Sequence, residues 1–96
     1  MTNEALDNAP SVAVIGSGYW GKNLVRNFYN LGVLKLICDK NETLLDTFRE
    51  QYAGVETCLA FNDVLRNKDI NAVVISTPAE THYRLAREAL LSKKHV

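Results

Sequence analysis

The sequence contains little of what marks a secreted, metal-binding or membrane protein. It has two cysteines, Cys38 and Cys58, whose separation does not match the spacing of a zinc site, so we expect buried thiols and no metal ion. No apolar run approaches the roughly 18 residues that a membrane span requires, and residues 1–8 lack the basic and apolar regions of a signal peptide. We therefore expect a cytoplasmic protein without a membrane partner.

Net charge is also absent, because eleven basic residues balance eleven acidic ones. Without an excess of positive charge there is no general field that attracts nucleic acid, so we expect a small ligand and no nucleic-acid partner. Proline and glycine are sparse, with two and five residues, while 47% of the residues are hydrophobic, which is typical of a folded domain. The 96 residues can hold one modest domain or part of one.

The apolar pattern alternates between the periods of a strand and of a helix. Apolar runs at 12–15, 33–38 and 72–76 are typical of buried strands, and 55–59 is a weaker candidate. The helical segments between and after them each carry an apolar stripe, formed by Leu24, Val25, Phe28 and Leu31; by Leu44, Leu45, Phe48 and Tyr52; by Val64 and Leu65; and by Leu85, Ala86, Ala89 and Leu90. This alternation predicts an α/β fold, a Rossmann-type doubly wound parallel sheet.

We predict the strand order 3-2-1-4-5, with residues 93–96 turning into a fifth strand that the sequence does not complete. Residues 1–10 form a polar N-terminal tail, and residues 11–96 form a dinucleotide-binding Rossmann domain that is incomplete at its C-terminus. An unfinished sheet leaves an open edge, so association into a homo-oligomer through that edge is a further expectation.

The predicted helix ends follow from short polar and glycine signals. Gly32 and Gly54 end the first two helices, and Asn62 caps the short third one. Thr77 and Glu80 match a capping box, with Pro78 at the first helical position of the last helix.

The segment Gly16-Ser17-Gly18-Tyr19-Trp20-Gly21 follows a buried strand and opens an amphipathic helix. In such a turn Gly16 permits the tight change of direction, Gly18 lets the backbone approach a pyrophosphate, and Gly21 lets the helix pack closely on the strand. The helix N-terminus supplies N–H groups and partial positive charge, so a diphosphate can be held without a lysine. The alternative is a glycine-rich turn that binds no ligand.

Asp39 lies at the end of the second strand, where a carboxylate accepts hydrogen bonds from the adenosine ribose and repels a 2'-phosphate. The residue favours NAD over NADP, although Lys40 beside it offers a partner for a phosphate. Alternatively, Asp39 is a solvated residue that supports the cap of the next helix through Asn41 or Glu42.

Further candidates lie at the end of the fourth strand and at the start of the first helix. Ser76, Thr77 and Pro78 face the crevice beside the first strand, where open parallel sheets bind their ligands. For His82, a ligand contact and a packed structural histidine are both open. The same two alternatives, cleft lining and packing, apply to Tyr19 and Trp20.

The string Val12-Ala13-Val14-Ile15-Gly16-Ser17-Gly18-Tyr19-Trp20-Gly21-Lys22-Asn23, together with Ser76-Thr77-Pro78 and His82, resembles the Gfo/Idh/MocA oxidoreductases, the relatives of glucose-fructose oxidoreductase and inositol dehydrogenase. The resemblance covers nearly the whole chain after Pro10. Within the family, the string from Gly18 to Asn23 is most similar to members that oxidise UDP-N-acetylated hexosamines or hexosaminuronates at the 3-position.

The resemblance implies that Gly16, Gly18 and Gly21 form the pyrophosphate loop, that Asp39 is the ribose acid, and that Ser76, Thr77, Pro78 and His82 line the cleft near the nicotinamide. It implies an NAD-dependent dehydrogenase of sugars or nucleotide sugars as the parent protein. The family's Glu-Lys-Pro motif and its substrate domain lie beyond Val96, so we name no catalytic residue and expect no turnover from these 96 residues alone.

Two other functions fit a similar fold. A non-enzymatic module can bind NAD or NADH and bias the state of a partner. A methyltransferase-like fold binds S-adenosylmethionine, but the third glycine, Gly21, and a loop of pyrophosphate size favour a dinucleotide.

Overall fold

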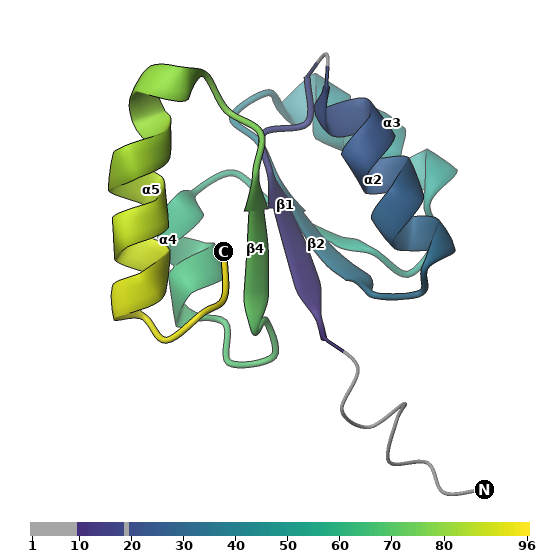
Figure 1. Ribbon diagram of the computed structural model, residues 1–96. Helices are drawn as coiled ribbons and strands as arrows, with labels where there is room; N and C mark the ends of the chain where they lie inside the picture. Colours follow the sequence, from purple (N-terminus) through teal and green to yellow (C-terminus); the bar gives the residue numbers. More distant parts are fainter. Residues whose placement is uncertain (1–9, 19) are drawn as a thin grey trace, which may run out of the picture.

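The computed structural model describes residues 10–18 and 20–96, in which four parallel strands form a sheet with helices on both faces (Figure 1). In chain order the elements are β1 (Val12–Ile15), α2 (Gly21–Asn30), β2 (Leu34–Cys38), α3 (Glu42–Gln51), β3 (Glu56–Cys58), α4 (Phe61–Arg66), β4 (Ala72–Ile75) and α5 (Ala79–Leu91). The predicted alternation of strands and helices is confirmed.

The sheet order is β3-β2-β1-β4, which confirms the 3-2-1-4 part of the predicted order. The chain runs outward from β1 through β2 to β3 and then crosses to β4, on the other side of β1. Helices α2 and α3 cover one face, and α4 and α5 cover the other (Figure 1). The direction of winding therefore reverses between β1 and β4, which is where ligands bind in open parallel sheets.

The residues after α5 return to the free edge of β4. The His95 N–H donates to the Asn71 carbonyl at 2.9 Å, and the Val73 N–H donates to the His95 carbonyl at 2.8 Å. These bonds make a single parallel bridge between Ala72 and His95. One bridge is not a strand, so the fifth strand stays a prediction.

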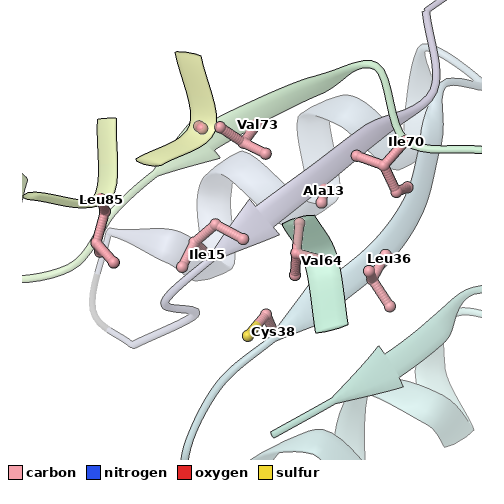
Figure 2. Close-up of a cluster of buried hydrophobic side chains, with 9 residues drawn as sticks. Ala13, Ile15, Leu36, Cys38, Val64, Ile70, Val73 and Leu85 are labelled. Atoms are coloured by element: carbon pink, nitrogen blue, oxygen red, sulfur yellow. The ribbon is translucent and has the colours of Figure 1, made fainter. Parts of the chain in front are cut away.

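Strands β1, β2 and β4 divide their side chains between two cores, because neighbouring side chains of a strand point to opposite faces. Toward α4 and α5 the core consists of Ala13, Ile15, Leu36, Cys38, Val64, Ile70, Val73, Leu85 and Ala89 (Figure 2). Toward α2 and α3 it consists of Val14, Val25, Ile37, Leu45, Phe48 and Tyr52. Both faces of the sheet are buried, as the near-continuous apolar runs of its strands predict.

The predicted inward orientation is wrong for two residues of the apolar stripes: Leu31 is 70% exposed and Leu90 is 61% exposed. Leu31 is the C-cap that follows the last helical residue of α2. Leu90 is rotated by about 100° from its neighbour Ala89, since a helix has 3.6 residues per turn, and so it turns away from the buried line through Leu85 and Ala89.

The helix ends partly follow the predicted signals. Gly32 and Gly54 have φ of 78° and 86°, the left-handed conformation expected after a helix. Asn62 is not a cap, because α4 already begins at Phe61, with Ala60 as its N-cap.

The predicted capping box of α5 is also wrong. Pro78, with ψ of 145°, is itself the N-cap, and no side chain caps the helix. Thr77 lies one residue before the N-cap, outside the helix. Its Oγ1 lies 2.6 Å from Thr81 Oγ1 and does not cap a backbone N–H of the helix. The Thr81 N–H donates to the Pro78 carbonyl at 2.9 Å.

Within these described ranges, no helix is long and apolar enough to cross a membrane.

A buried lysine joins the end of α5 to the loop before β4. Lys94 is only 6% exposed, and its Nζ donates to the carbonyls of Asn67 at 2.9 Å and Ile70 at 2.6 Å. Burial lowers the pKa of Lys94. The two carbonyls replace the water that the ammonium group loses, so the loop and the turn after α5 hold each other in place.

We predict that Lys94→Met lowers the free energy of unfolding by about 2 kcal/mol, because it leaves two carbonyls without their charged donor. Thermal or urea unfolding followed by circular dichroism measures the change. The matched control is Lys93→Met at the exposed neighbouring position, which should stay within about 0.5 kcal/mol of the parent. Equal losses in the two variants would contradict the assignment.

Candidate functional site

A cleft of about 670 Å³ lies at the carboxyl ends of the strands. Of the residues that the sequence analysis singled out, those that line it are Gly16, Gly18, Trp20, Asp39, Ser76, Thr77 and Pro78. They follow β1, β2 and β4, and Trp20 among them is the N-cap of α2, so the parallel sheet brings to one edge residues as distant in sequence as Gly16 and Pro78.

Gly16 and Gly21 are glycines because the protein itself leaves no space for a side chain. Gly16 has φ of 82°, and a Cβ there would lie 2.9 Å from Thr77 Cγ2 and 3.1 Å from the Ser76 carbonyl. A Cβ on Gly21 would lie 2.4 Å from the Gly16 carbonyl oxygen. The start of α2 thus packs directly on the turn that follows β1.

Gly18 differs, because nothing lies within 4 Å of the place where its Cβ would be. Its backbone borders the cleft. Packing against the described residues therefore does not require a glycine here.

The N-terminus of α2 points its dipole at this loop. The N-cap, Trp20, makes no capping hydrogen bond through its side chain, and the first turn from Gly21 contains no acidic residue. The partial positive charge of the helix end is therefore not neutralised by a carboxylate of its own helix, a condition that favours a bound anion.

The Asp39 carboxylate is fixed by three hydrogen bonds. Its Oδ2 accepts the Ser17 N–H at 2.8 Å and the Ser17 hydroxyl at 3.1 Å, and its Oδ1 accepts the Asn41 N–H at 2.8 Å. Asn41 caps α3 by accepting the Leu44 N–H at 3.1 Å. Asp39 therefore supports the cap of α3, which was one of the two alternatives for this residue. It is also hydrogen-bonded to the glycine loop and borders the cleft.

Ser17 is fully buried and does not line the cleft. Its side chain and its N–H both serve Asp39, so it acts on any ligand through that carboxylate.

The end of β4 is held against β1 and then turns into α5. The Ser76 N–H donates to the Ile15 carbonyl at 2.8 Å. His82 is exposed and is not among the residues that line the cleft; its Nε2–H donates to the Thr77 carbonyl at 2.6 Å. This hydrogen bond gives His82 a structural role between the residue after β4 and the first turn of α5, and the residue is exposed and does not border the cleft.

Tyr19 lies outside the described residues. Trp20 lines the cleft with 70% of its surface exposed, so of its two alternatives the structure favours cleft lining.

Sequence reasoning missed one wall of the cleft. Leu59 and Phe61 follow β3, and Thr81 and Arg84 come from α5. Lys40, which the sequence analysis named as a partner for a phosphate, also lines the cleft. Arg84 is paired with Glu88 at 3.4 Å. The position of Leu59 and Phe61 at the end of a strand was a usable signal, because the carboxyl ends of parallel strands share one edge.

The comparisons with known proteins agree with this geometry. Residues 11–96 match the family model described as an oxidoreductase family with an NAD-binding Rossmann fold. The chain belongs to the Gfo/Idh/MocA oxidoreductase family. It is the NAD-binding Rossmann part of that family, and the predicted family and the predicted cofactor, NAD, are both confirmed.

Three similar proteins illustrate the family. A glycosyl hydrolase family 109 protein from Shewanella pealeana is 37% identical over 97 residues, which cover 88% of this chain and 21% of that protein. Scyllo-inositol dehydrogenase from Lactobacillus casei, solved with bound cofactor NAD(H) and scyllo-inositol, matches with a TM-score of 0.84 and 24% identity over 93% of this chain and 27% of its own. The WlbA dehydrogenase from Bordetella pertussis, solved with NADH and UDP-GlcNAcA, matches with a TM-score of 0.80 and 26% identity over 90% of this chain and 27% of its own.

The chain thus spans about a fifth of the length of the curated relatives that it matches.

We predict that alanine destabilises the fold at one glycine of the loop and is tolerated at another. Gly21→Ala should lower the free energy of unfolding by at least about 2 kcal/mol, because the new Cβ meets the Gly16 carbonyl oxygen. Gly18→Ala, which adds the same methyl group in open space, should change it by less than about 0.5 kcal/mol. Urea unfolding of both variants compares them, and a Gly18→Ala chain as unstable as Gly21→Ala would show that Gly18 is also required by the fold.

Proposed function

We propose that this domain binds NAD in the cleft, with the pyrophosphate on the loop from Gly16 to Gly21 and the adenosine ribose on Asp39. The observation that carries the proposal is the open space at Gly18, on a loop whose other two glycines are explained by packing. An anion at the N-terminus of α2 would approach the backbone of Gly18 without meeting a side chain.

The rest of the cleft fits the other parts of the cofactor. Ser17 and Asn41 hold the Asp39 carboxylate in place through three of its roughly four acceptor sites, so Oδ1 keeps one site for a ribose hydroxyl. The wall of Leu59, Phe61 and the stem of Arg84 offers the flat apolar surface that an adenine ring needs. In this arrangement Ser76, Thr77 and Pro78 lie toward the nicotinamide half.

For the whole protein we propose a sugar or nucleotide-sugar dehydrogenase, in which NAD accepts a hydride from a hydroxyl-bearing carbon. The support is the family and two similar structures, described as a scyllo-inositol dehydrogenase and a dehydrogenase in complex with NADH and UDP-GlcNAcA. The contribution of these 96 residues is to bind and orient the cofactor. The fifth strand after Val96, the substrate domain and the cytoplasmic location stay predictions.

A second candidate is net glycoside hydrolysis, because the curated relatives at 35–39% identity are described as glycosyl hydrolase family 109 proteins. NAD-dependent glycosidases are known among glycoside hydrolases. The two candidates differ in one readout: a dehydrogenase accumulates NADH with its substrate, whereas a hydrolase releases a sugar without net NADH. The family match does not favour the purely sensing module.

Calorimetric titration of the purified chain with NAD and S-adenosylmethionine tests the binding proposal. We expect heat only with NAD, and we expect Gly18→Val to weaken NAD binding at least about tenfold, because its side chain occupies the approach to the pyrophosphate. Circular dichroism of the variant should show the parent fold. Undiminished binding by Gly18→Val would place the cofactor elsewhere.

A second titration compares NAD with NADP in Asp39→Asn. The amide oxygen still accepts from Ser17, while its NH2 group replaces the oxygen that accepted the Asn41 N–H. The negative charge that repels a 2'-phosphate is lost, so the preference for NAD should fall at least about tenfold. Asp69→Asn, at an exposed position before β4, is the matched control and should keep the parent ratio. An unchanged ratio in Asp39→Asn would remove Asp39 from the ribose site.

A further inference from the structure

The two cysteines of the chain are neighbours at the edge of the cofactor cleft. Cys38 is the last residue of β2, Cys58 is the last residue of β3, and the two are partners in the parallel register. Both pack against the core on the side of α4, where Figure 2 shows Cys38 together with Val64. Both thiols are free, and the sequence has no other cysteine.

The spacing of the strands suits a disulfide at this pair. Neighbouring strands lie about 4.8 Å apart, which is within the range of about 4.4–6.8 Å that separates the Cα atoms of bonded cysteines. The Cβ atoms of a register pair are also separated by about the strand spacing, so the two strand ends must approach each other by up to about 1 Å to close the bond. Strand β3 has only three residues, so its end is the part of the sheet that can make this movement.

The two thiols have different environments. Cys58 is half-buried, and a hydrogen bond from the Cys38 thiol lowers its pKa. The pKa of Cys38 is raised by the same hydrogen bond and by burial. The charged groups that face the pair, Asp39 and Asp63, oppose thiolate formation. Cys58 is thus the more accessible thiol, which favours it as the attacking cysteine in thiol–disulfide exchange.

Bond formation here would act on the ribose acid. Asp39 directly follows Cys38, and its N–H donates to the Cys58 carbonyl at 3.1 Å. Cys38 itself lines the cleft. Drawing the ends of β2 and β3 together therefore moves the backbone that carries Asp39 and strains its bonds to Ser17.

We propose that Cys58 and Cys38 form a thiol–disulfide exchange site for small disulfides, and that closing it lowers the affinity for NAD. The thiolate of Cys58 attacks one sulfur of the small disulfide, forming a mixed disulfide and releasing one small thiol. The Cys38 thiol then loses its proton to solvent and attacks the Cys58 sulfur, forming the Cys38–Cys58 bond and releasing the second small thiol. The protein loses two hydrogen atoms and the small disulfide is reduced to two thiols.

The first readout does not depend on NAD. The 96-residue chain is incubated with glutathione disulfide and examined by intact-mass spectrometry and thiol titration. We expect a monomer that has lost two hydrogen atoms and both free thiols, and that dithiothreitol restores. Cys38→Ala should stop at the glutathione adduct on Cys58, and Cys58→Ala should react at least about tenfold more slowly. Unreacted parent chain, or a disulfide only between two copies, overturns the proposal.

The second readout is the affinity for NAD of the same samples, which rests on the proposed function. The oxidised parent should bind NAD at least about tenfold more weakly than the reduced parent, while Cys58→Ala treated in the same way should keep its own affinity. A disulfide that forms without changing NAD affinity overturns the regulatory role. If the reduced parent itself binds no NAD, the proposed function fails, and the mass readout still decides whether the exchange site exists.

Discussion

The structure depends most on the close approach between the start of α2 and the turn after β1. At Gly21 the helix backbone lies so near the Gly16 carbonyl that a single added carbon would be 2.4 Å from that oxygen. The same turn touches the end of β4, since a Cβ on Gly16 would meet Thr77 and the Ser76 carbonyl. Helix, turn and two strands are thus fixed at one point, and the N-terminal end of α2 has one position relative to the sheet. A helix dipole can select an anion only when its end is held in this way, because the effect is confined to the first turn.

The features that sequence reasoning predicted are those determined by local chemistry. The apolar run of β1, the glycine spacing and the change to helical period each lie within a few neighbouring residues, and each is found where expected. The capping box at Thr77 also looked local, but Pro78 occupies the N-cap and leaves Thr77 to pair with Thr81. Likewise Leu90 has the right residue type but the wrong rotation about α5. Both errors concern a position that either of two neighbouring residues can occupy, the N-cap in one case and the inward side of α5 in the other. The sequence alone does not decide between the two neighbours.

The wall formed by Leu59, Phe61 and Arg84 was not predicted, although the end of β3 offered a weak signal for its first two residues. Strand β3 has three residues with an exposed first position, so it has no clear apolar pattern that would mark its end as part of a ligand site. Arg84 reaches the cleft only because α5 packs on the sheet through Leu85 and Ala89. The pairing of Cys38 with Cys58 likewise depends on the register between β2 and β3. All three features are set by tertiary packing, which follows from the completed sheet.

The backbone hydrogen bonds connect the glycine loop, Asp39 and the edge strand β3 into one unit. The Gly16 N–H donates to the Cys38 carbonyl at 2.8 Å, and the Asp39 N–H donates to the Cys58 carbonyl at 3.1 Å. Ser17 adds a direct link between the glycine loop and Asp39, because its N–H and hydroxyl both donate to the Asp39 carboxylate. The N–H of Ser17 is therefore used inside the protein, and the loop offers the ligand its open approach at Gly18 and the helix end instead. The glycine loop and Asp39 are thus linked directly, so a displacement of β3 is transmitted to both.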